Sequence, residues 1–243
     1  MKEIEKDEII IYWINNKENQ TRYNHMNALL EKYFPKNEKI HINAVMEEKK
    51  YNGVSIAHLN AVLKGLIQKK PFLVLEDDVN IDYTKKELNK IFPLKINDDI
   101  SGVYFGISAW GNRKKWDLKN KSDKIVYTNE KIKMFKGAEA ENYDEFYVKI
   151  NSMYCAHAIL YIKKRYILET ATTCMMGVIS NKPHDVLLLE LQNKYNIIGL
   201  RNPVFYQDLK LGGQQRTTRI KIKKQLKEND IENNNDKLLH NFE

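Results

Sequence analysis

Cysteine, proline and glycine are all scarce in this chain of 243 residues, which contains 2 Cys, 5 Pro and 10 Gly. Two cysteines, Cys155 and Cys174, are too few for a disulfide scaffold or a structural zinc site. Neither has a recognisable His or Asp context in the sequence, so we expect two inert buried thiols. The few prolines and glycines, together with 10% aromatic residues, exclude a fibrous or disordered protein.

Long apolar runs are also missing. No run approaches the ~20 residues that a membrane-spanning helix needs. The first eight residues, MKEIEKDE, are too acidic and too polar for a signal peptide. We therefore expect a soluble, cytoplasmic protein without a membrane span.

The chain has an excess of basic residues, with a net charge of +8. This charge favours an anionic partner without specifying it. A nucleic-acid-binding protein would cluster its bases on one face among aromatic side chains. Here the bases are mixed with acids, and only residues 216–227 carry charge of a single sign. A nucleic-acid partner is therefore the least favoured interpretation.

The apolar pattern predicts an α/β fold. Two continuous apolar runs, 9–14 and 72–75, are typical of strands buried on both faces. Between them, helical spacing over 23–33 and 54–68 flanks a short strand at 39–45. Alternating buried strands and amphipathic helices indicate βαβ units on a parallel sheet.

The second half of the chain has a looser pattern. We expect a short helix ending at 88–92, helices near 166–168 and over 185–195, and strands at 102–107, 125–127, 133–135, 152–162, 197–198 and 204–206. Residues 110–122 form a polar loop with Trp110 and Trp116 at its ends, where they could stack on a sugar or anchor the core. We expect one domain over 9–208, an N-terminal extension over 1–8, and a basic, Lys/Asn-rich, partly disordered segment over 209–243.

Three adjacent carboxylates, Glu76, Asp77 and Asp78, directly follow the apolar strand at 72–75. They repel one another, and partial burial makes the repulsion stronger. In open α/β sheets, ligands bind outside the carboxyl ends of the strands. A divalent cation such as Mg²⁺ or Mn²⁺, which prefers oxygen ligands, would relieve the repulsion. A solvated acidic turn is the alternative interpretation.

Four segments together resemble glycosyltransferase family 25, the lipopolysaccharide-biosynthesis and procollagen-galactosyltransferase group. The acidic segment 72–79 (FLVLEDDV) is similar to that family's ILEDDV signature. The other segments follow in the family's order: Tyr12–Asn15 with Arg22 downstream, Gly53–His58, and Ala156–Ile162 followed by Pro183–Asp185. The resemblance covers roughly residues 9–207, and only the acidic motif is specific by itself.

The resemblance implies a single-domain, GT-A type, Rossmann-like mixed sheet flanked by helices. It also implies transfer of a hexose from a UDP-sugar to a hydroxyl of a glycan or glycoprotein acceptor, with inversion and with Mn²⁺ or Mg²⁺ as the cofactor. Glu76 and Asp78 have the spacing of a DxD-type motif and are the expected metal ligands, with Asp185 as the catalytic base. The expected donor-binding residues are Asn15, Asn16, Arg22, His58 and Asp77.

Several residues leave alternatives open. Asp185 could equally stabilise a helix N-terminus, and His58 could be a structural histidine. His184 could complete a metal shell or be structural, and residues 212–219 could form a lid or a solvated basic tail. Ala57 stands where the family usually has Ser, which leaves room for a pseudo-enzyme that binds a nucleotide or glycan without turnover.

Overall fold

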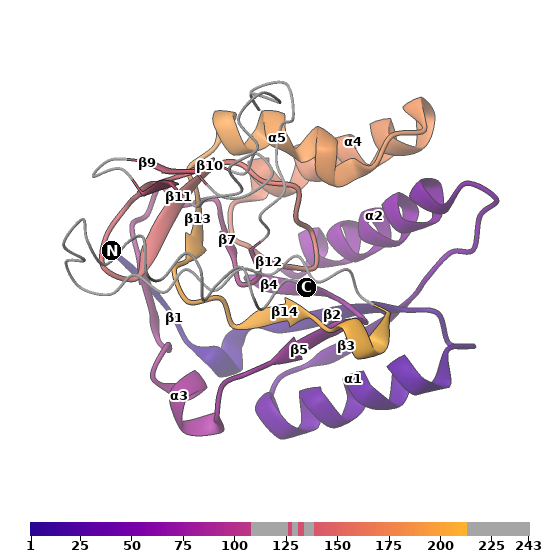
Figure 1. Cartoon of the computed structure of the whole chain (residues 1–243), viewed down its shortest axis with the longest axis horizontal. Coiled ribbons are helices and arrows are strands. Elements are labelled where there is room, and N and C mark those ends of the chain that lie inside the picture. The colour runs from indigo at the N-terminus through magenta and orange to yellow at the C-terminus, as the bar shows by residue number, and fades with distance from the viewer. Residues whose placement is uncertain (108–125, 128–130, 134–138, 213–243) are drawn as a thin grey trace.

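The computed structural model describes residues 1–107, 126–127, 131–133 and 139–212 (Figure 1). Within them, a mixed sheet of ten strands has the order β3-β2-β4-β12-β7-β13-β11-β10-β9-β8. Helices cover both faces of the sheet, so the expected mixed α/β sheet flanked by helices is confirmed. The loop with Trp110 and Trp116, and residues 213–243 with most of the 212–219 turn, lie outside the described residues.

The strands of the large sheet run in both directions. β2 is parallel to β3 and β4, whereas β12 is antiparallel to both β4 and β7. β13 is parallel to β7 and antiparallel to β11. The strands are β2 (Ile10–Asn15), β3 (Lys39–Asn43), β4 (Phe72–Glu76), β7 (Gly102–Tyr104), β8 (Val126–Tyr127), β9 (Lys131–Lys133), β10 (Glu139–Asn142), β11 (Tyr147–Ser152), β12 (Ala158–Tyr161) and β13 (Ile197–Leu200).

Two small antiparallel sheets complete the strand pairing. β1 (Lys2–Ile4) pairs with β6 (Leu94–Ile96), and β5 (Val79–Ile81) pairs with β14 (Phe205–Gln207). The helices are α1 (Gln20–Tyr33), α2 (Lys50–Gln68), α3 (Lys85–Asn89), α4 (Lys164–Ser180) and α5 (His184–Lys194), with 3₁₀ turns η1 (Lys6–Glu8) and η3 (Leu209–Leu211). Among these helices, none is long and apolar enough to cross a membrane.

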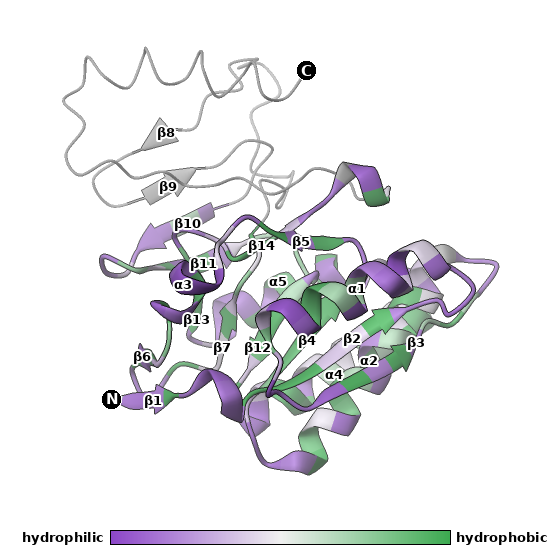
Figure 2. Cartoon of the chain, turned by 90° about the horizontal axis from the view of Figure 1, so that it is seen from below, coloured by the Kyte–Doolittle hydropathy of each residue, from purple (hydrophilic) through white to green (hydrophobic). Residues whose placement is uncertain are grey.

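The sheet separates two hydrophobic cores. α1 lies on one side of the sheet, and α2, α4 and α5 lie on the other (Figure 1). Along β2, Tyr12 packs in the core on the α2 side, while Ile11 and Trp13 pack in the core on the α1 side. Both faces of this strand are therefore buried, which explains its continuous apolar sequence. Figure 2 shows hydrophobic residues running through the central strands. Each such side chain contributes about 1.5–3 kcal/mol by leaving water.

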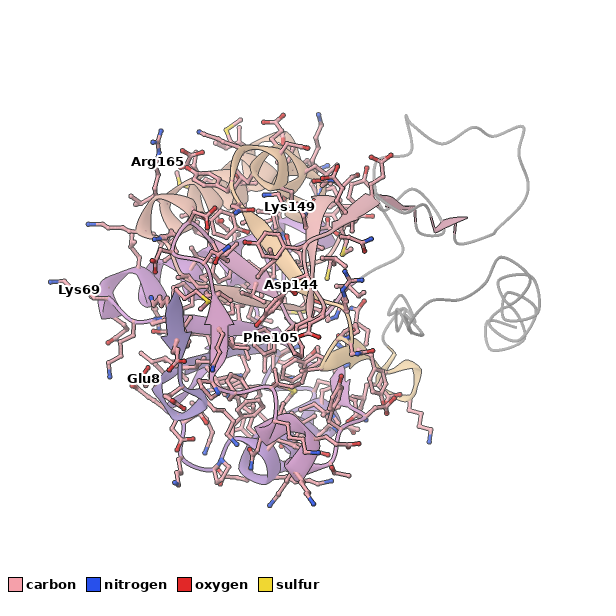
Figure 3. All side chains as sticks on the ribbon, turned by 90° about the vertical axis from the view of Figure 1, so that its left-hand side faces the viewer. Glu8, Lys69, Phe105, Asp144, Lys149 and Arg165 are labelled. Carbon is pink, nitrogen blue, oxygen red and sulfur yellow. The ribbon has the colours of Figure 1, made fainter. Side chains whose placement is uncertain are left out.

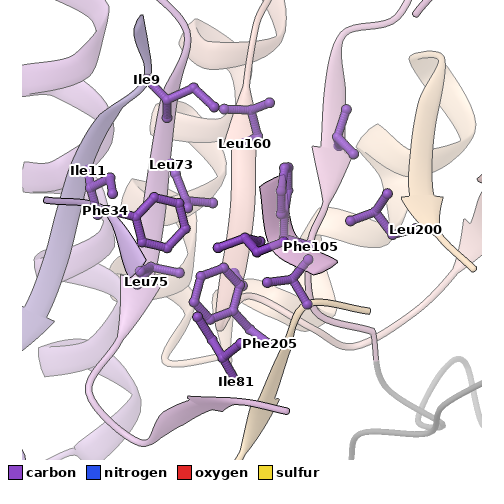
Figure 4. Close-up of a cluster of buried hydrophobic side chains, with 14 of the residues drawn as sticks. Ile9, Ile11, Phe34, Leu73, Leu75, Ile81, Phe105, Leu160, Leu200 and Phe205 are labelled. Carbon is purple, nitrogen blue, oxygen red and sulfur yellow. The ribbon is translucent and has the colours of Figure 1, made fainter. Parts of the chain in front are cut away.

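Phe205 fixes β14 against the α1-side core. Its ring stacks on Phe34 with centroids 6.2 Å apart, and its backbone N–H donates to Phe105 O at 3.1 Å (Figure 4). β14 then pairs with β5, which directly follows the acidic segment in the sequence. This packing brings residues near 207 to the carboxyl end of β4.

The structure differs from the sequence-based prediction in several elements, including β6 and β10, which were not predicted. The strand predicted over 152–162 is shorter in the structure: β11 ends at Ser152, and β12 covers only Ala158–Tyr161. The connection at 153–157 has the apolar pattern of a strand but is not part of one. α2 begins at Lys50, one turn earlier than predicted. β1 was not predicted, and its Ile4 is buried by the pairing with β6. Cys155 and Cys174 are both buried, and neither is in a disulfide.

Candidate functional site

The candidate site lies where two parallel strands end together. Ile14 is the register partner of Glu76, so β2 and β4 bring Asn15 and the acidic segment to the same edge of the sheet. The three carboxylates then point to different neighbours. Asp77 contacts α1, Glu76 contacts α2, and Asp78 contacts β14. The single acidic motif therefore supplies three distinct microenvironments.

Asp77 is held by two donors from the α1 side. Arg22 Nη1 donates to Asp77 Oδ1 at 2.6 Å, and Asn15 Nδ2 donates to Asp77 Oδ2 at 2.7 Å. Arg22 Nε also donates to Leu211 O at 2.7 Å, which ties α1 to the segment after β14. Asn15 is only 1% exposed, and its Oδ1 is a buried acceptor with no hydrogen-bond partner among the described residues. Such an acceptor suits a hydroxyl or amine of a bound molecule.

Glu76 is held by a buried histidine of α2. His58 Nε2 lies 3.1 Å from Glu76 Oε1. Burial lowers the pKa of His58 to about 4, so its imidazole is neutral at pH 7 and donates from Nε2 to the carboxylate. His58 therefore orients Glu76 without neutralising its charge.

His184 stacks on His58 from the first turn of α5. Their ring centroids are 4.3 Å apart. Burial, and then the neighbouring His58, hold the pKa of His184 well below its usual range. Its Nε2 is buried without a hydrogen-bond partner in the described part of the chain. The pair connects α2 and α5 behind the acidic segment.

Asp78 is the most deeply buried of the three carboxylates, at 8% exposure. Burial raises its pKa to about 7, the charges of Glu76 and Asp77 add to the shift, and Gln207 and Arg22 oppose it. Gln207 Nε2 lies 3.3 and 3.2 Å from the two Asp78 carboxylate oxygens and 3.5 Å from Glu76 Oε2. The Gln207 amide therefore lies between the two expected metal ligands.

The backbone and neighbouring side chains keep Gln207 in place. Asp208 N donates to Asp78 O at 2.7 Å, and Asn80 Nδ2 donates to Asp208 Oδ2 at 2.9 Å. Gln207 was not predicted as a site residue, because one glutamine after a short strand signal has no distinguishing pattern. Only the pairing of β14 with β5 reveals its role.

The described site has more negative than positive charge. Glu76, Asp77 and Asp78 are contacted by one guanidinium, that of Arg22, and by the neutral His58. The oxygen donors of Glu76 and Asp78 suit a hard divalent cation, which would supply the missing positive charge. In the arrangement described, no group of three or more His, Cys, Asp or Glu side chains is placed to hold a metal ion. Glu76 and Asp78 would hold such an ion, and the amide nitrogen of Gln207 lies between their carboxylates.

The structure brings most of the expected site residues together. Asn16 instead bonds within the loop before α1, where its Oδ1 accepts from Glu18 N at 3.0 Å and its Nδ2 faces Met46 Sδ at 3.5 Å. Asp185 lies half-buried in the first turn of α5, next to His184. The residues that converge are Asn15, Arg22, His58, Glu76, Asp77 and Asp78.

A cysteine–histidine pair supports the end of β4. Cys155 Sγ lies 3.3 Å from His157 Nδ1, and Glu76 N donates to His157 O at 3.0 Å. The expectation that neither cysteine has a histidine nearby is therefore wrong for Cys155. The two residues are separated by only one position, but their contact requires the irregular backbone between β11 and β12.

Comparison with known proteins gives little further information. No family model matches the chain, and no curated protein matches it. Among solved structures, the chain is similar to the crystal structure of a glycosyltransferase involved in the glycosylation of the major capsid of PBCV-1. That similarity has a TM-score of 0.38 and 10% sequence identity, and it covers 79% of this chain and 92% of the other. At this level it shows neither a shared family nor a shared activity.

Proposed function

We propose that the protein is a metal-dependent glycosyltransferase of the GT-A type. It would transfer a hexose from a UDP-sugar to a hydroxyl of a glycan or glycoprotein acceptor, with inversion. One observation carries this proposal: residues from four separate segments converge on a carboxylate cluster with excess negative charge, at the carboxyl edge of parallel strands. Open α/β sheets bind their ligands at this edge.

The α1 side of the site would bind the nucleotide. Asn15 Oδ1 is a buried acceptor available to a ribose or base donor, and Asp77 is fixed beside it. Arg22 adds a positive charge next to the segment after β14. Asn15 and Asp77 would bind hydroxyl groups of the nucleoside, and Arg22 would bind an anionic phosphate. A nucleoside diphosphate carries both kinds of group.

Glu76 and Asp78 would hold Mn²⁺ or Mg²⁺. When bound, such an ion neutralises the charge that develops on the departing diphosphate. The chain contributes orientation, because His58 directs Glu76 and the β14 segment directs Asp78. The Gln207 amide is a neutral cap on this acidic pair, and an ion held by both carboxylates would compete with it.

Asp185 would act as the catalytic base. A displacement at the anomeric carbon needs a group that accepts the proton of the attacking hydroxyl. Asp185 lies half-buried in the first turn of α5, directly after the histidine that stacks on His58. A carboxylate at this position also interacts favourably with the helix N-terminus. The two roles are compatible.

A screen of UDP- and GDP-sugars tests the proposal. Release of the nucleotide should occur with one UDP-sugar, should require Mn²⁺ or Mg²⁺, and should fall by about 100-fold or more in Asp78→Ala. The matched control is Glu190→Gln, which changes an exposed carboxylate of α5. Equal turnover in the wild type and in Asp78→Ala would remove Asp78 from the mechanism.

Binding without turnover is the second candidate function. The Gln207 amide favours it, because its nitrogen lies between Glu76 and Asp78, within 3.2–3.5 Å of their carboxylate oxygens. So does Ala57, which is buried beside His58 and offers no hydroxyl. Calorimetry that detects UDP binding, with no release of UDP from any nucleotide sugar, would identify such a binding protein.

A further inference from the structure

α2 and α4 together expose an unusual amount of apolar surface. In the described part of the chain, eleven large hydrophobic side chains are exposed, and eight of them lie on these two helices. We call six of them the α2–α4 surface: Leu63 and Ile67 of α2, and Leu168, Met175, Met176 and Ile179 of α4; Tyr51 and Val54 lie on a different face of α2. The two helices lie side by side on one side of the sheet (Figure 1). A concentration of exposed apolar side chains like this is typical of a surface that binds another protein or a membrane.

The spacing of these residues follows the helices. Leu63 and Ile67 are four residues apart on α2, and Met175 and Ile179 are four apart on α4, so each pair forms an apolar stripe on one helix face. The opposite face of α2 is already packed in the core through residues such as Ala61. The most exposed members are Ile67 at 76% and Ile179 at 74%. Ile67 and Ile179 therefore lie mainly outside the core.

The charges along α2 and α4 are mostly positive. Residues 49–70 contain five lysines and no Asp or Glu. Residues 163–182 contain three lysines and one arginine, with Glu169 as their single acid. Glu169 is bonded to Lys194 of α5 and to Tyr195, which directly follows α5, so its charge is already paired. Lys69 and Arg165 extend outward from the body of the protein (Figure 3). The next acids along the chain are Glu47 and Glu48, which precede α2, and Asp185, which lies in the first turn of α5.

We propose that the α2–α4 surface binds an anionic lipid bilayer. The apolar side chains would enter the boundary between headgroups and acyl chains, and the surrounding bases would contact lipid phosphates. A helix that combines an apolar face with flanking lysines and arginines lies in the plane of the membrane interface in this way. A second copy of the chain fits less well, because pairing two such faces brings like charges together. This proposal does not depend on the proposed sugar transfer.

Vesicle sedimentation of the full chain tests the proposal. The probes are vesicles of phosphatidylcholine with about 30% phosphatidylglycerol, and vesicles of phosphatidylcholine alone. The wild type should bind the anionic vesicles and bind the neutral ones more weakly. The double variant Ile67→Ser/Ile179→Ser keeps every charge, and its partition coefficient should fall by about tenfold or more. Phe146→Ser is the matched control, because Phe146 is 63% exposed and belongs to neither helix, so its loss should change nothing.

Three results would overturn the proposal. One is a wild type that stays in the supernatant with both kinds of vesicle. Another is unchanged binding by the double variant, which would assign the attraction to charge elsewhere, such as the basic segment 209–243. The third is sedimentation velocity showing a wild-type dimer that the double variant converts to a monomer, because the surface would then join two copies. Nucleotide-sugar turnover measured without vesicles is a separate readout, so failure of one proposal leaves the other standing.

Discussion

Asp78 shows how burial and charge oppose each other within one residue. Its carboxyl group is almost completely enclosed and lies beside Glu76, yet its nearest donor is the neutral amide of Gln207. Burial, and then the charge of Glu76, raise the pKa of Asp78 to about 7. A bound divalent cation would replace that neutral contact with a charged one and favour the ionised form. The same residue is therefore costly in the empty fold and useful in a metal complex.

The raised pKa of Asp78 predicts that the free energy of unfolding decreases as the pH rises. The folded protein holds the Asp78 proton up to about pH 7, whereas the unfolded chain releases it near its ordinary pKa of 3.8. The free energy of unfolding is therefore unaffected by Asp78 below pH 3.8. It falls as the pH rises from 3.8 toward 7, because the unfolded chain releases the Asp78 proton and the folded protein does not. In chelator, Asp78→Asn should therefore match the wild type near pH 4 and exceed it by about 2–4 kcal/mol at pH 8 in urea denaturation. A difference that does not vary with pH would contradict the shift.

Gln207 predicts a change in cation affinity. Gln207→Ala removes the amide that caps Glu76 and Asp78, so Mn²⁺ no longer competes with it. We expect the half-saturating Mn²⁺ concentration to fall several-fold and the metal-free protein to lose about 1–2 kcal/mol of stability. Gln20→Ala on the exposed start of α1 is the control. Weaker Mn²⁺ binding in Gln207→Ala would instead make Gln207 a ligand.

At the scale of elements, two glycines allow close packing: Gly65 lets α2 approach the sheet, and Gly177 lets α4 approach α2. A Cβ at Gly65 of α2 would lie 2.4–2.6 Å from three ring atoms of Phe72, which is fully buried in β4. A Cβ at Gly177 of α4 would lie 2.9 Å from Ser55 Oγ of α2 and 3.3 Å from His184 Cβ. Close packing at these two positions keeps His58 and His184 behind the acidic segment.

Gly65→Ala tests this close approach. Alanine favours a helix by about 1 kcal/mol over glycine, but here its methyl group collides with a buried ring. We expect a net loss of about 1–3 kcal/mol in urea denaturation. Asn60→Ala, on the exposed face of the same helix, should be neutral or slightly stabilising. A stabilised Gly65→Ala would show that α2 moves away from β4 at little cost.

Elements with a clear pattern of apolar residues could be predicted from the sequence. The other elements form only through contacts with distant segments, so they could not. β2 and β4 are apolar throughout because both of their faces are buried, so the sequence alone indicates them. The connection at 153–157 is equally buried, and no local signal separates it from a strand. β1 consists of three residues whose strand character comes from pairing with β6. Short or irregular segments therefore required the tertiary structure.

At the scale of the whole molecule, ligand binding should stabilise the fold only as a ternary complex. UDP would contact α1 and β2, and the cation would contact β4. Because both ligands bind only the folded protein, their binding free energy adds to the free energy of unfolding. At 100 times the dissociation constant the gain is about 2.7 kcal/mol, or roughly 5–10 °C for a chain of this size. Differential scanning fluorimetry with UDP and Mn²⁺ measures it.

The controls for this experiment separate the two ligands. UDP with chelator, Mn²⁺ alone, and Asp78→Asn with both ligands should each give a shift well below that of the complete mixture. A full shift with UDP in chelator would show that the nucleotide binds without the cation, and would remove Glu76 and Asp78 from donor binding.

The sequence by itself determined the α/β character of the chain and placed an acidic triplet at the end of a buried strand. These features are local, because the apolar periods of strands and helices and the order of residues require no knowledge of distant contacts. Only the tertiary structure decided that Asp77 faces Arg22, that Glu76 faces His58, and that Gln207 caps Asp78. It also decided that Leu63 and Ile67 face solvent, although their spacing alone is typical of a core helix. Contacts between residues far apart in the chain depend on how the elements pack, and no local pattern encodes that packing.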